Sequence, residues 1–252
     1  MTIIRSTLLS QSSNVLFGMS TRVGGASGGH FDLNLSFSVG DASENVRKNR
    51  TRFFTELGIR EEQVVFPRQE HTSNVQICSE GRAFPACDGL ITAKENLFLA
   101  ISVADCVPIV LLDTINNVVA AVHAGWRGTT LRIVEKAVQL MKDKFSSGPE
   151  SIVTFIGPSA GVCCYEVGEE VAKLYPQVCI HPKKNGKFHI DVKQANVLQL
   201  LENGVQDTQI EVHPDCTIHN SQYHSFRRDG KNSGRMLAIV GIKKCIIRKP
   251  SR

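Results

Sequence analysis

The chain has 252 residues, of which 42% are hydrophobic and 21% are charged, proportions that are typical of a soluble globular protein with a substantial core. Its formal net charge of +5 is mild, and the basic residues are scattered apart from Lys243-Lys244 and Arg248-Lys249 near the C-terminus. This pattern does not favour nucleic acid as a partner, and an anionic small molecule such as phosphate fits as well.

The hydrophobic pattern predicts helices that are separated by groups of strands. Helices are expected over residues 44–57, 131–145, 167–175 and 191–201, and the second shows the clearest amphipathic spacing. Apolar strands are expected over residues 98–113, 118–126, 151–156 and 235–242. Because the helices do not follow each strand in turn, we expect an α+β fold with layered sheets. No repeat or linker divides the chain, so we predict a single domain over residues 1–252.

The cysteines and the N-terminal residues indicate a location. The eight cysteines have no CxxC spacing, and Cys163 and Cys164 are adjacent, which is awkward for a disulfide framework. We therefore expect reduced thiols in a cytoplasmic protein. The first residues lack the apolar core and cleavage site of a signal peptide. No stretch approaches the ~20 apolar residues of a membrane span, so no membrane association is expected.

Two histidines and one cysteine are candidate metal ligands. Cys106 and His123 lie in apolar runs, where a polar side chain is costly unless it is bonded, and His71 follows the segment RQE. Thiolate sulfur and imidazole nitrogen are typical zinc ligands, and three protein ligands leave a fourth position open for catalysis. We therefore predict a catalytic metal site at His71, Cys106 and His123. Taken singly, Cys106 or His123 is more often a buried core residue.

The predicted hairpin around residues 113–117 supports the pairing of two of these ligands. Residues 113–117 have turn chemistry, and a four-residue loop over 113–116 places Cys106 directly opposite His123. Opposed residues have Cβ atoms ~4.5–5.5 Å apart, which suits two ligands of one ion. Pro108 indicates an edge strand or a bulge beside Cys106.

A serine nucleophile is an alternative. Residues 157–161 read GPSAG and match the G-x-S-x-G elbow after a predicted strand, with Asp191 and His213, His219 or His224 following in the right order. The elbow requires a helix directly after Ser159, however, and helical character begins only near residue 167. This interpretation is therefore weak.

Two pairs of glycines and two pairs of arginines are candidate phosphate-binding groups. The pairs Gly24-Gly25 and Gly28-Gly29 offer backbone N–H groups to a phosphate or form a lid, although a flexible loop is the simpler interpretation. Arg227 and Arg228 either belong to a solvated turn or bind an anion, and the same choice applies to Arg47 and Arg50.

A series of motifs occurs in order across almost the whole chain. They are STRxGG from Ser20, LNL from Leu33, QxH ending at His71, DGL from Asp88, ADCxP from Ala104, HAGWRG from His123, CCYEV from Cys163 and RRD from Arg227. Together they resemble the laccase-domain (YfiH-like) proteins, formerly called polyphenol oxidases and now regarded as purine nucleoside phosphorylases. The chain departs from that pattern at Ser159-Ala160, where Cys-Ile is frequent, and at Phe226, where Tyr is usual.

The resemblance implies a four-layer α/β/β/α sandwich of mixed sheets and a zinc ion held by His71, Cys106 and His123. It implies phosphorolysis of adenosine, inosine, guanosine and methylthioadenosine to the free base and (methylthio)ribose 1-phosphate, and deamination of adenosine. Asn34 and Arg50 match family positions that line the substrate and phosphate pocket. A purine nucleoside and phosphate are the expected partners. The oligomeric state stays open, and copper competes with zinc for such ligands.

Our hypothesis assigns phosphate to Arg50 and to one of Arg227 or Arg228, where the anion would offset positive charge on the ribose. Asp105 either orients the Cys106 ligand or is a turn residue.

Three other functions use the same residues differently. A cysteine hydrolase would use Cys106 as the nucleophile and His123 as the base, without metal. A copper-dependent polyphenol oxidase fits the sequence less well, because the chain has no H-x-H pair and a multi-copper cluster would lack its usual ligands. A non-catalytic zinc protein would need a fourth ligand, such as Cys78 or Cys87.

Overall fold

The computed structural model describes residues 1–79, 84–184 and 186–244, so the basic pair Arg248-Lys249 lies outside the described residues. Three sheets carry the strands. The five-stranded sheet has the order β1 (Ile3–Ile4), β2 (Val15–Ser20), β14 (Met236–Ile242), β6 (Phe98–Val103) and β3 (Val64–Val65). The six-stranded sheet has the order β13 (Ile210–Val212), β9 (Ile152–Ile156), β7 (Val107–Asp113), β8 (Val118–Ala124), β5 (Gly89–Thr92) and β4 (Val75–Ile77).

The third sheet is small, with the order β10 (Glu166–Val167), β12 (Phe188–Ile190) and β11 (Ile180–Pro182). The α-helices are α1 (Ser43–Leu57), α2 (Trp126–Thr130), α3 (Ile133–Phe145), α4 (Glu169–Ala172), α5 (Val192–Glu202) and α6 (Phe226–Asp229). Short 3₁₀ turns cover Leu9–Gln11, Glu61–Gln63, Pro149–Ser151, Gln177–Cys179, Asp207–Gln209 and Gly230–Asn232. Among the helices of the described residues, none combines the length and the apolar character needed to cross a lipid bilayer.

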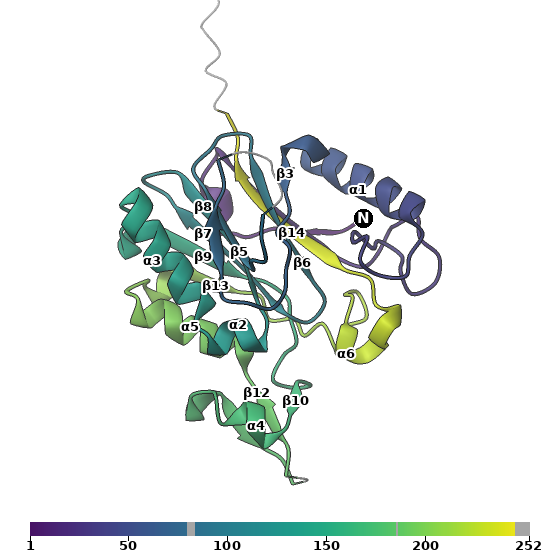
Figure 1. Ribbon diagram of the computed structural model, residues 1–252, viewed down its shortest axis with the longest axis vertical. Coiled ribbons are helices and arrows are strands. Elements are labelled where there is room, and N and C mark those ends of the chain that lie inside the picture. The colour runs from purple at the N-terminus through teal and green to yellow at the C-terminus, as the bar shows by residue number, and fades with distance from the viewer. Residues whose placement is uncertain (80–83, 185, 245–252) are drawn as a thin grey trace, which may run out of the picture.

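Three buried clusters hold these elements together. The first lies between α1 and the five-stranded sheet and includes Phe53 and Phe98. The second lies between the two large sheets and includes Leu99 and Phe155. The third lies between the six-stranded sheet and the helices α3 and α5, which cover its outer face (Figure 1). The predicted α+β class is therefore confirmed, with mixed sheets whose inner strands are apolar on both faces.

Two of the predicted helices are shorter than expected. The helix predicted over residues 131–145 begins at Ile133, because Arg132 has a φ of +59° and separates α2 from α3. In the segment 167–175 only Glu169–Ala172 is α-helical, since residues 166–167 pair with β12 instead. The helix predicted over 191–201 is α5, and Asp191 caps its N-terminus by accepting from the Gln194 N–H. These differences affect the ends of elements rather than their order.

The strand predicted over residues 98–113 is in fact two strands in different sheets. β6 belongs to the five-stranded sheet and β7 to the six-stranded sheet, and the chain crosses between them at residues 104–106. Asp105 makes this crossing possible with a φ of +85°, and its carbonyl accepts from the Ala160 N–H at 2.8 Å. The crossing leaves Cys106 between the ends of the two large sheets.

The predicted register of the next hairpin is wrong by two residues. β8 pairs His123 with Pro108 and Ala124 with Val107, so Cys106 lies beyond the end of the ladder. The loop covers 114–117, because the Asp113 carboxylate accepts from the N–H groups of residues 115 and 116. A two-residue shift keeps every side chain on its predicted face. β7 is also a central strand, so Pro108 does not mark a sheet edge; it precedes the ladder with β9, which begins at Ile109.

Candidate active site

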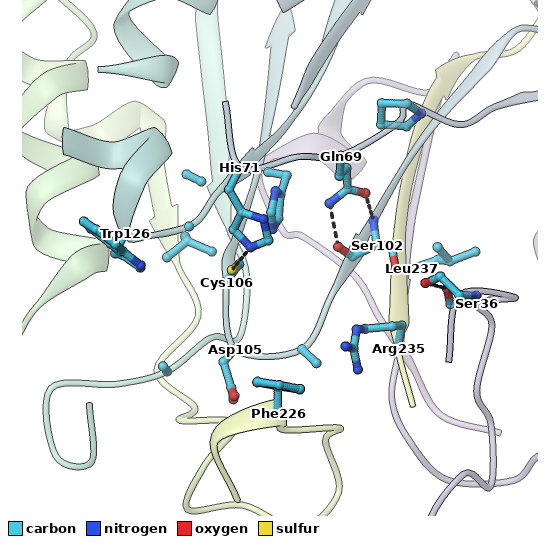
Figure 2. A pocket seen from close by; sticks show the side chains of 18 of the residues that line it. Ser36, Gln69, His71, Ser102, Asp105, Cys106, Trp126, Phe226, Arg235 and Leu237 are labelled. Atoms are coloured by element: carbon cyan, nitrogen blue, oxygen red, sulfur yellow. Dashed lines mark hydrogen bonds between the residues drawn. The ribbon is translucent and has the colours of Figure 1, made fainter. Parts of the chain in front are cut away.

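The three predicted ligands meet at the end of β8. The Nε2 or Nδ1 atoms of His71 and His123 and the Sγ atom of Cys106 all lie within 4.8 Å of one another. The Nε2 of His71 is 3.8 Å from the Cys106 sulfur (Figure 2), and the two imidazole rings are edge-on with centroids 4.9 Å apart. His71 reaches this point from the segment between β3 and β4, with a φ of +58°. A backbone conformation of this kind in a non-glycine residue is typical of functional sites.

Asp88 holds both histidines in place and was not predicted as a site residue. Its buried carboxylate accepts from Nδ1 of His123 at 2.8 Å and from the backbone N–H of His71 at 3.1 Å. The other oxygen accepts from the N–H and the hydroxyl of Thr72. Burial alone would raise the pKa of Asp88, but the hydrogen bonds from His123 and Thr72 lower it to about 2. Asp88 therefore fixes the His123 tautomer and leaves Nε2 free to bind.

The charges of Cys106 and His123 are coupled. Burial alone would raise the pKa of the Cys106 thiol, but the two neighbouring histidines lower it to about 6. Burial would likewise lower the pKa of His123, whereas Cys106 and Asp88 raise it to about 9. In the metal-free protein the pair is therefore a thiolate and an imidazolium near neutral pH. A thiolate is the form that either binds a metal or attacks a substrate.

We expect Cys106 in metal-free protein to react with iodoacetamide as a low-pKa thiol. Its rate should fall as the pH drops through about 6 and stay nearly constant up to about pH 9, because the thiolate is already formed. Peptide mapping by mass spectrometry across this pH range measures the rate, and added Zn²⁺ should protect the residue. A rate that keeps rising up to pH ~8.5–9, as for an ordinary thiol, would contradict this account.

A cavity of about 840 Å³ opens beside the three ligands, a volume within the usual range for small-molecule sites. Its walls combine aromatic and cationic side chains. The aromatic ones are Phe37, Phe66, Trp126, Tyr165 and Phe226, and the cationic ones are Arg50, Arg68, Arg127, Arg227 and Arg235. This lining suits a flat, partly apolar ligand that carries an anionic group.

Of the four predicted substrate residues, the structure brings Arg50 and Arg227 to the cavity. The Arg50 guanidinium lies between the rings of Phe37 and Phe66, at 4.5 and 4.3 Å from their centroids. It also donates to the Leu35 carbonyl and pairs with Glu61. Arg227 lies over the Tyr165 ring at 5.1 Å. Aromatic faces therefore hold both guanidinium groups in fixed positions.

Asn34 and Arg228 do not line the cavity, and their side chains stabilise loops. The buried Asn34 amide accepts from the backbone N–H groups of Ser36 and Arg235 and donates to Asp41. Arg228 pairs with Asp229 and donates to carbonyl oxygens, including that of Thr217. Both residues act on the cavity only through the loops that they fix.

Arg235 is a cavity residue that sequence reasoning missed. Its Nη1 donates to the carbonyls of Ser233 and Gly234, which leaves the Nε and Nη2 groups without a hydrogen-bond partner among the described residues. The guanidinium stacks on Phe226 at 5.5 Å and points into the cavity, on the opposite side from Trp126 in Figure 2. Burial lowers its pKa, although Asp105 and Cys106 oppose that effect. The only signal in the sequence is an arginine directly before the apolar strand β14.

Asp105 is a turn residue that joins three loops. One carboxylate oxygen accepts from the Thr217 hydroxyl at 2.7 Å, and the other accepts from the Arg227 N–H at 2.6 Å. Together with the Ala160 contact, these bonds position the loop that carries Arg227. Asp105 therefore shapes the cavity wall around Cys106.

The alternative motifs have structural explanations. Ser159 is fully buried, its hydroxyl has no hydrogen-bond partner among the described residues, and residues 160–165 are not helical. Asp191 is a helix cap, so the structure gives no support to a serine nucleophile. The N–H groups of Gly24 and Gly25 donate to the Asp32 carboxylate, so an internal side chain occupies this cradle. Cys78 and Cys87 are buried in the cluster between the sheets and are not part of the three-ligand group.

Comparison with known proteins places the chain in a family. The family described as multi-copper polyphenol oxidoreductase laccase matches residues 16–243. The chain belongs to this family. It is 36% identical to a protein of Bacteroides thetaiotaomicron named purine nucleoside phosphorylase, over 94% of each chain. It is 33% identical to a protein from an unknown prokaryotic organism named adenosine deaminase RL5, over 81% of this chain and 84% of that one.

A solved structure confirms the fold of this laccase-family chain. The crystal structure of YlmD from Geobacillus stearothermophilus matches with a TM-score of 0.91 and 32% identity, and covers 97% of both chains. The family resemblance read from the HAGWRG and ADCxP motifs is thereby confirmed.

Proposed function

We propose that this laccase-family protein is a zinc-dependent purine nucleoside phosphorylase. It would cleave adenosine, inosine, guanosine and methylthioadenosine with phosphate. The packing of α1, the five-stranded sheet, the six-stranded sheet and the helices α3 and α5 in this order supports a four-layer α/β/β/α sandwich. The observation that carries the proposal is the convergence of His71, Cys106 and His123 on one wall of an arginine- and aromatic-lined cavity. The name of the Bacteroides relative supplies the reaction.

The donor set fits a zinc ion. Two imidazoles and a thiol with a lowered pKa lie within 4.8 Å of one another. Asp88 orients His123 through the hydrogen bond to its Nδ1 atom, as carboxylates often do for zinc-binding histidines. His71, Cys106 and His123 would hold the ion. When bound, zinc supplies Lewis acidity, which can polarise a purine base or lower the pKa of a water.

The side chains of the cavity would bind and orient the two substrates. The aromatic residues offer faces for the purine, and Phe226 projects from α6 into the same space. Phosphate would lie against the guanidinium groups of Arg235 and Arg227, and Arg50 would add a third positive charge to the same cavity. As the base departs, positive charge develops on the ribose, and a phosphate fixed beside it offsets that charge.

Adenosine deamination is a second candidate activity of the same site. The relative named adenosine deaminase RL5 supports it, and both reactions take the same nucleoside, although phosphorolysis cleaves its bond between ribose and base and deamination replaces the amino group of the base. We propose it as a side activity.

Two other readings share these residues. A cysteine hydrolase at Cys106 and His123 is consistent with the lowered thiol pKa, and Asp88 would orient the His123 base, but this function leaves His71 without a role. A copper-dependent polyphenol oxidase has the family's description in its favour. The cavity, however, has one group of three ligands, and the sequence has no H-x-H pair.

Incubation of the purified protein with adenosine, with and without phosphate, tests the proposal. Adenine and ribose 1-phosphate should appear only when phosphate is present, and inosine should appear with or without it. Chromatography with mass spectrometry identifies all three products. If zinc-loaded, folded protein forms none of them, the proposed function is wrong.

Removal of the Arg235 guanidinium should weaken phosphate binding more than nucleoside binding. We expect Arg235→Ala to raise the KM for phosphate ~10–100-fold, the loss expected for hydrogen bonds to a charged group. Initial rates at varied phosphate and fixed nucleoside measure this change. Arg60→Ala removes an exposed guanidinium outside the cavity and serves as the matched control. A raised nucleoside KM with an unchanged phosphate KM would instead place the base beside Arg235.

A further inference from the structure

A second group of metal-ligating side chains lies outside the active site. Cys163 and Cys164 follow β9, Cys216 follows β13, and their three sulfur atoms lie within 4.8 Å of one another. Cys163 and Cys216 border a separate cavity of about 510 Å³ that Asp215 and His219 also line. The backbone fixes the two loops against each other, since the Thr217 N–H donates to the carbonyl of residue 159 at 2.9 Å.

The environment of Cys216 favours a thiolate. Its buried sulfur accepts from the Gly161 N–H at 3.2 Å. Burial alone would raise the pKa of Cys216, but this bond and those from the backbone of residues 218 and 219 lower it. The other two thiols are opposite in character: burial and the neighbouring cysteines raise the pKa of Cys163 to about 12. The Gly161 N–H therefore already points at a sulfur atom that lies within 4.8 Å of two others.

A positive charge is already close to the cluster. The ammonium group of Lys193, on α5, donates to the carbonyls of His213 and Asp215, which flank the loop of Cys216. This ammonium would offset part of the negative charge that three thiolates bring to one divalent cation.

We propose that Cys163, Cys164 and Cys216 form a second metal site, which takes a thiophilic divalent cation of the Zn²⁺ class. Zinc–sulfur bonds of ~2.3 Å place tetrahedral ligands ~3.8 Å apart, so small side-chain rotations are enough to bring the three sulfurs onto one ion. Each protonated thiol loses its proton to the solvent when the ion binds. The fourth coordination position of the ion would be open to the cavity that His219 lines.

The bound cation would stiffen the wall of the active site. Cys163 and Cys164 lie on the loop that contacts Asp105 through Ala160, and Cys216 precedes Thr217, which also bonds to Asp105. An ion that joins these loops holds both partners of Asp105 at once. This site is independent of the reaction proposed above.

Cadmium binding to reduced, metal-stripped protein tests the proposal. Cd²⁺ prefers the same sulfur ligands as zinc, and its thiolate charge-transfer absorption reports each Cd–S bond. Wild type should bind two equivalents per chain. Cys163→Ala, which alters an exposed residue, and Cys106→Ala should each bind one. The matched control Cys179→Ala removes a buried cysteine outside both groups and should still bind two.

Circular dichroism confirms that each variant is folded, and Cys216→Ala repeats the test from the other loop. The proposal is overturned if folded Cys163→Ala and Cys216→Ala bind as many equivalents as wild type and keep its full charge-transfer absorption.

Discussion

His123→Ala is expected to abolish phosphorolysis, with a fall in kcat/KM of at least ~10³-fold, the scale seen when a group essential to the reaction is removed. The substitution deletes one of the three proposed ligands and leaves Asp88 without its imidazole partner. Cys106→Ala should cause a loss of the same order. Because these residues act as a unit, the double variant should be hardly worse than either single one.

Steady-state rates with inosine and phosphate measure the effect, together with the zinc content of each variant. His181→Ala is a suitable control, since it removes an exposed histidine of the small sheet. We expect a ~10³-fold loss. If folded His123→Ala protein keeps more than about a tenth of the wild-type kcat/KM, the three proposed ligands do not take part in the proposed reaction.

Asp88→Asn should weaken zinc binding ~10–100-fold, the usual cost of losing a carboxylate behind a histidine ligand. The amide no longer fixes the His123 tautomer, and it no longer offers a charged acceptor to the N–H groups of His71 and Thr72. Competition with a chromogenic chelator measures the affinity. Asp143→Asn, which alters an exposed carboxylate on α3, should leave it unchanged.

The same substitution should change the acid stability of the metal-free protein. The pKa of Asp88 is about 2 in the folded state, against an ordinary value of 3.8. Its stabilising contribution is therefore present above about pH 4 and is lost as the pH falls through about 2. The shift corresponds to about 2–3 kcal/mol of unfolding free energy at neutral pH.

Urea unfolding of the two metal-free proteins across this pH range measures the contribution. The difference in free energy between wild type and Asp88→Asn should shrink as the pH falls. A difference that is the same at every pH would contradict the ionised, hydrogen-bonded carboxylate described above.

The sequence predicted that His71, Cys106 and His123 act together because thiols and imidazoles are typical zinc donors and because Cys106 and His123 lie in apolar segments, and a local argument is enough for that. It could not predict the partner of His123. Asp88 precedes β5, and only the pairing of β5 with β8 brings it next to His123. Such a contact between distant segments leaves no local signal beyond an aspartate before a glycine. Arg235 was missed for the same reason.

The hairpin register shows the limit of a local turn argument. Both four-residue loops, 113–116 and 114–117, agree with the hydrophobic pattern, because a shift of two residues keeps the faces. The Asp113 side chain selects the second loop by accepting two N–H groups inside it. Likewise, β6 and β7 read as one strand because both are buried on two faces, and nothing in their apolar residues marks the change of sheet at Asp105.

Restoration of activity by zinc would show whether phosphorolysis needs the metal. Stripped wild-type protein is titrated with Zn²⁺, and the phosphate consumed per minute with inosine is followed alongside the metal bound. Our account predicts that stripped protein is inactive, that wild type regains phosphorolysis as zinc binds, and that Cys106→Ala does not. If stripped wild type consumes phosphate at the full rate, zinc at His71, Cys106 and His123 is not part of the reaction.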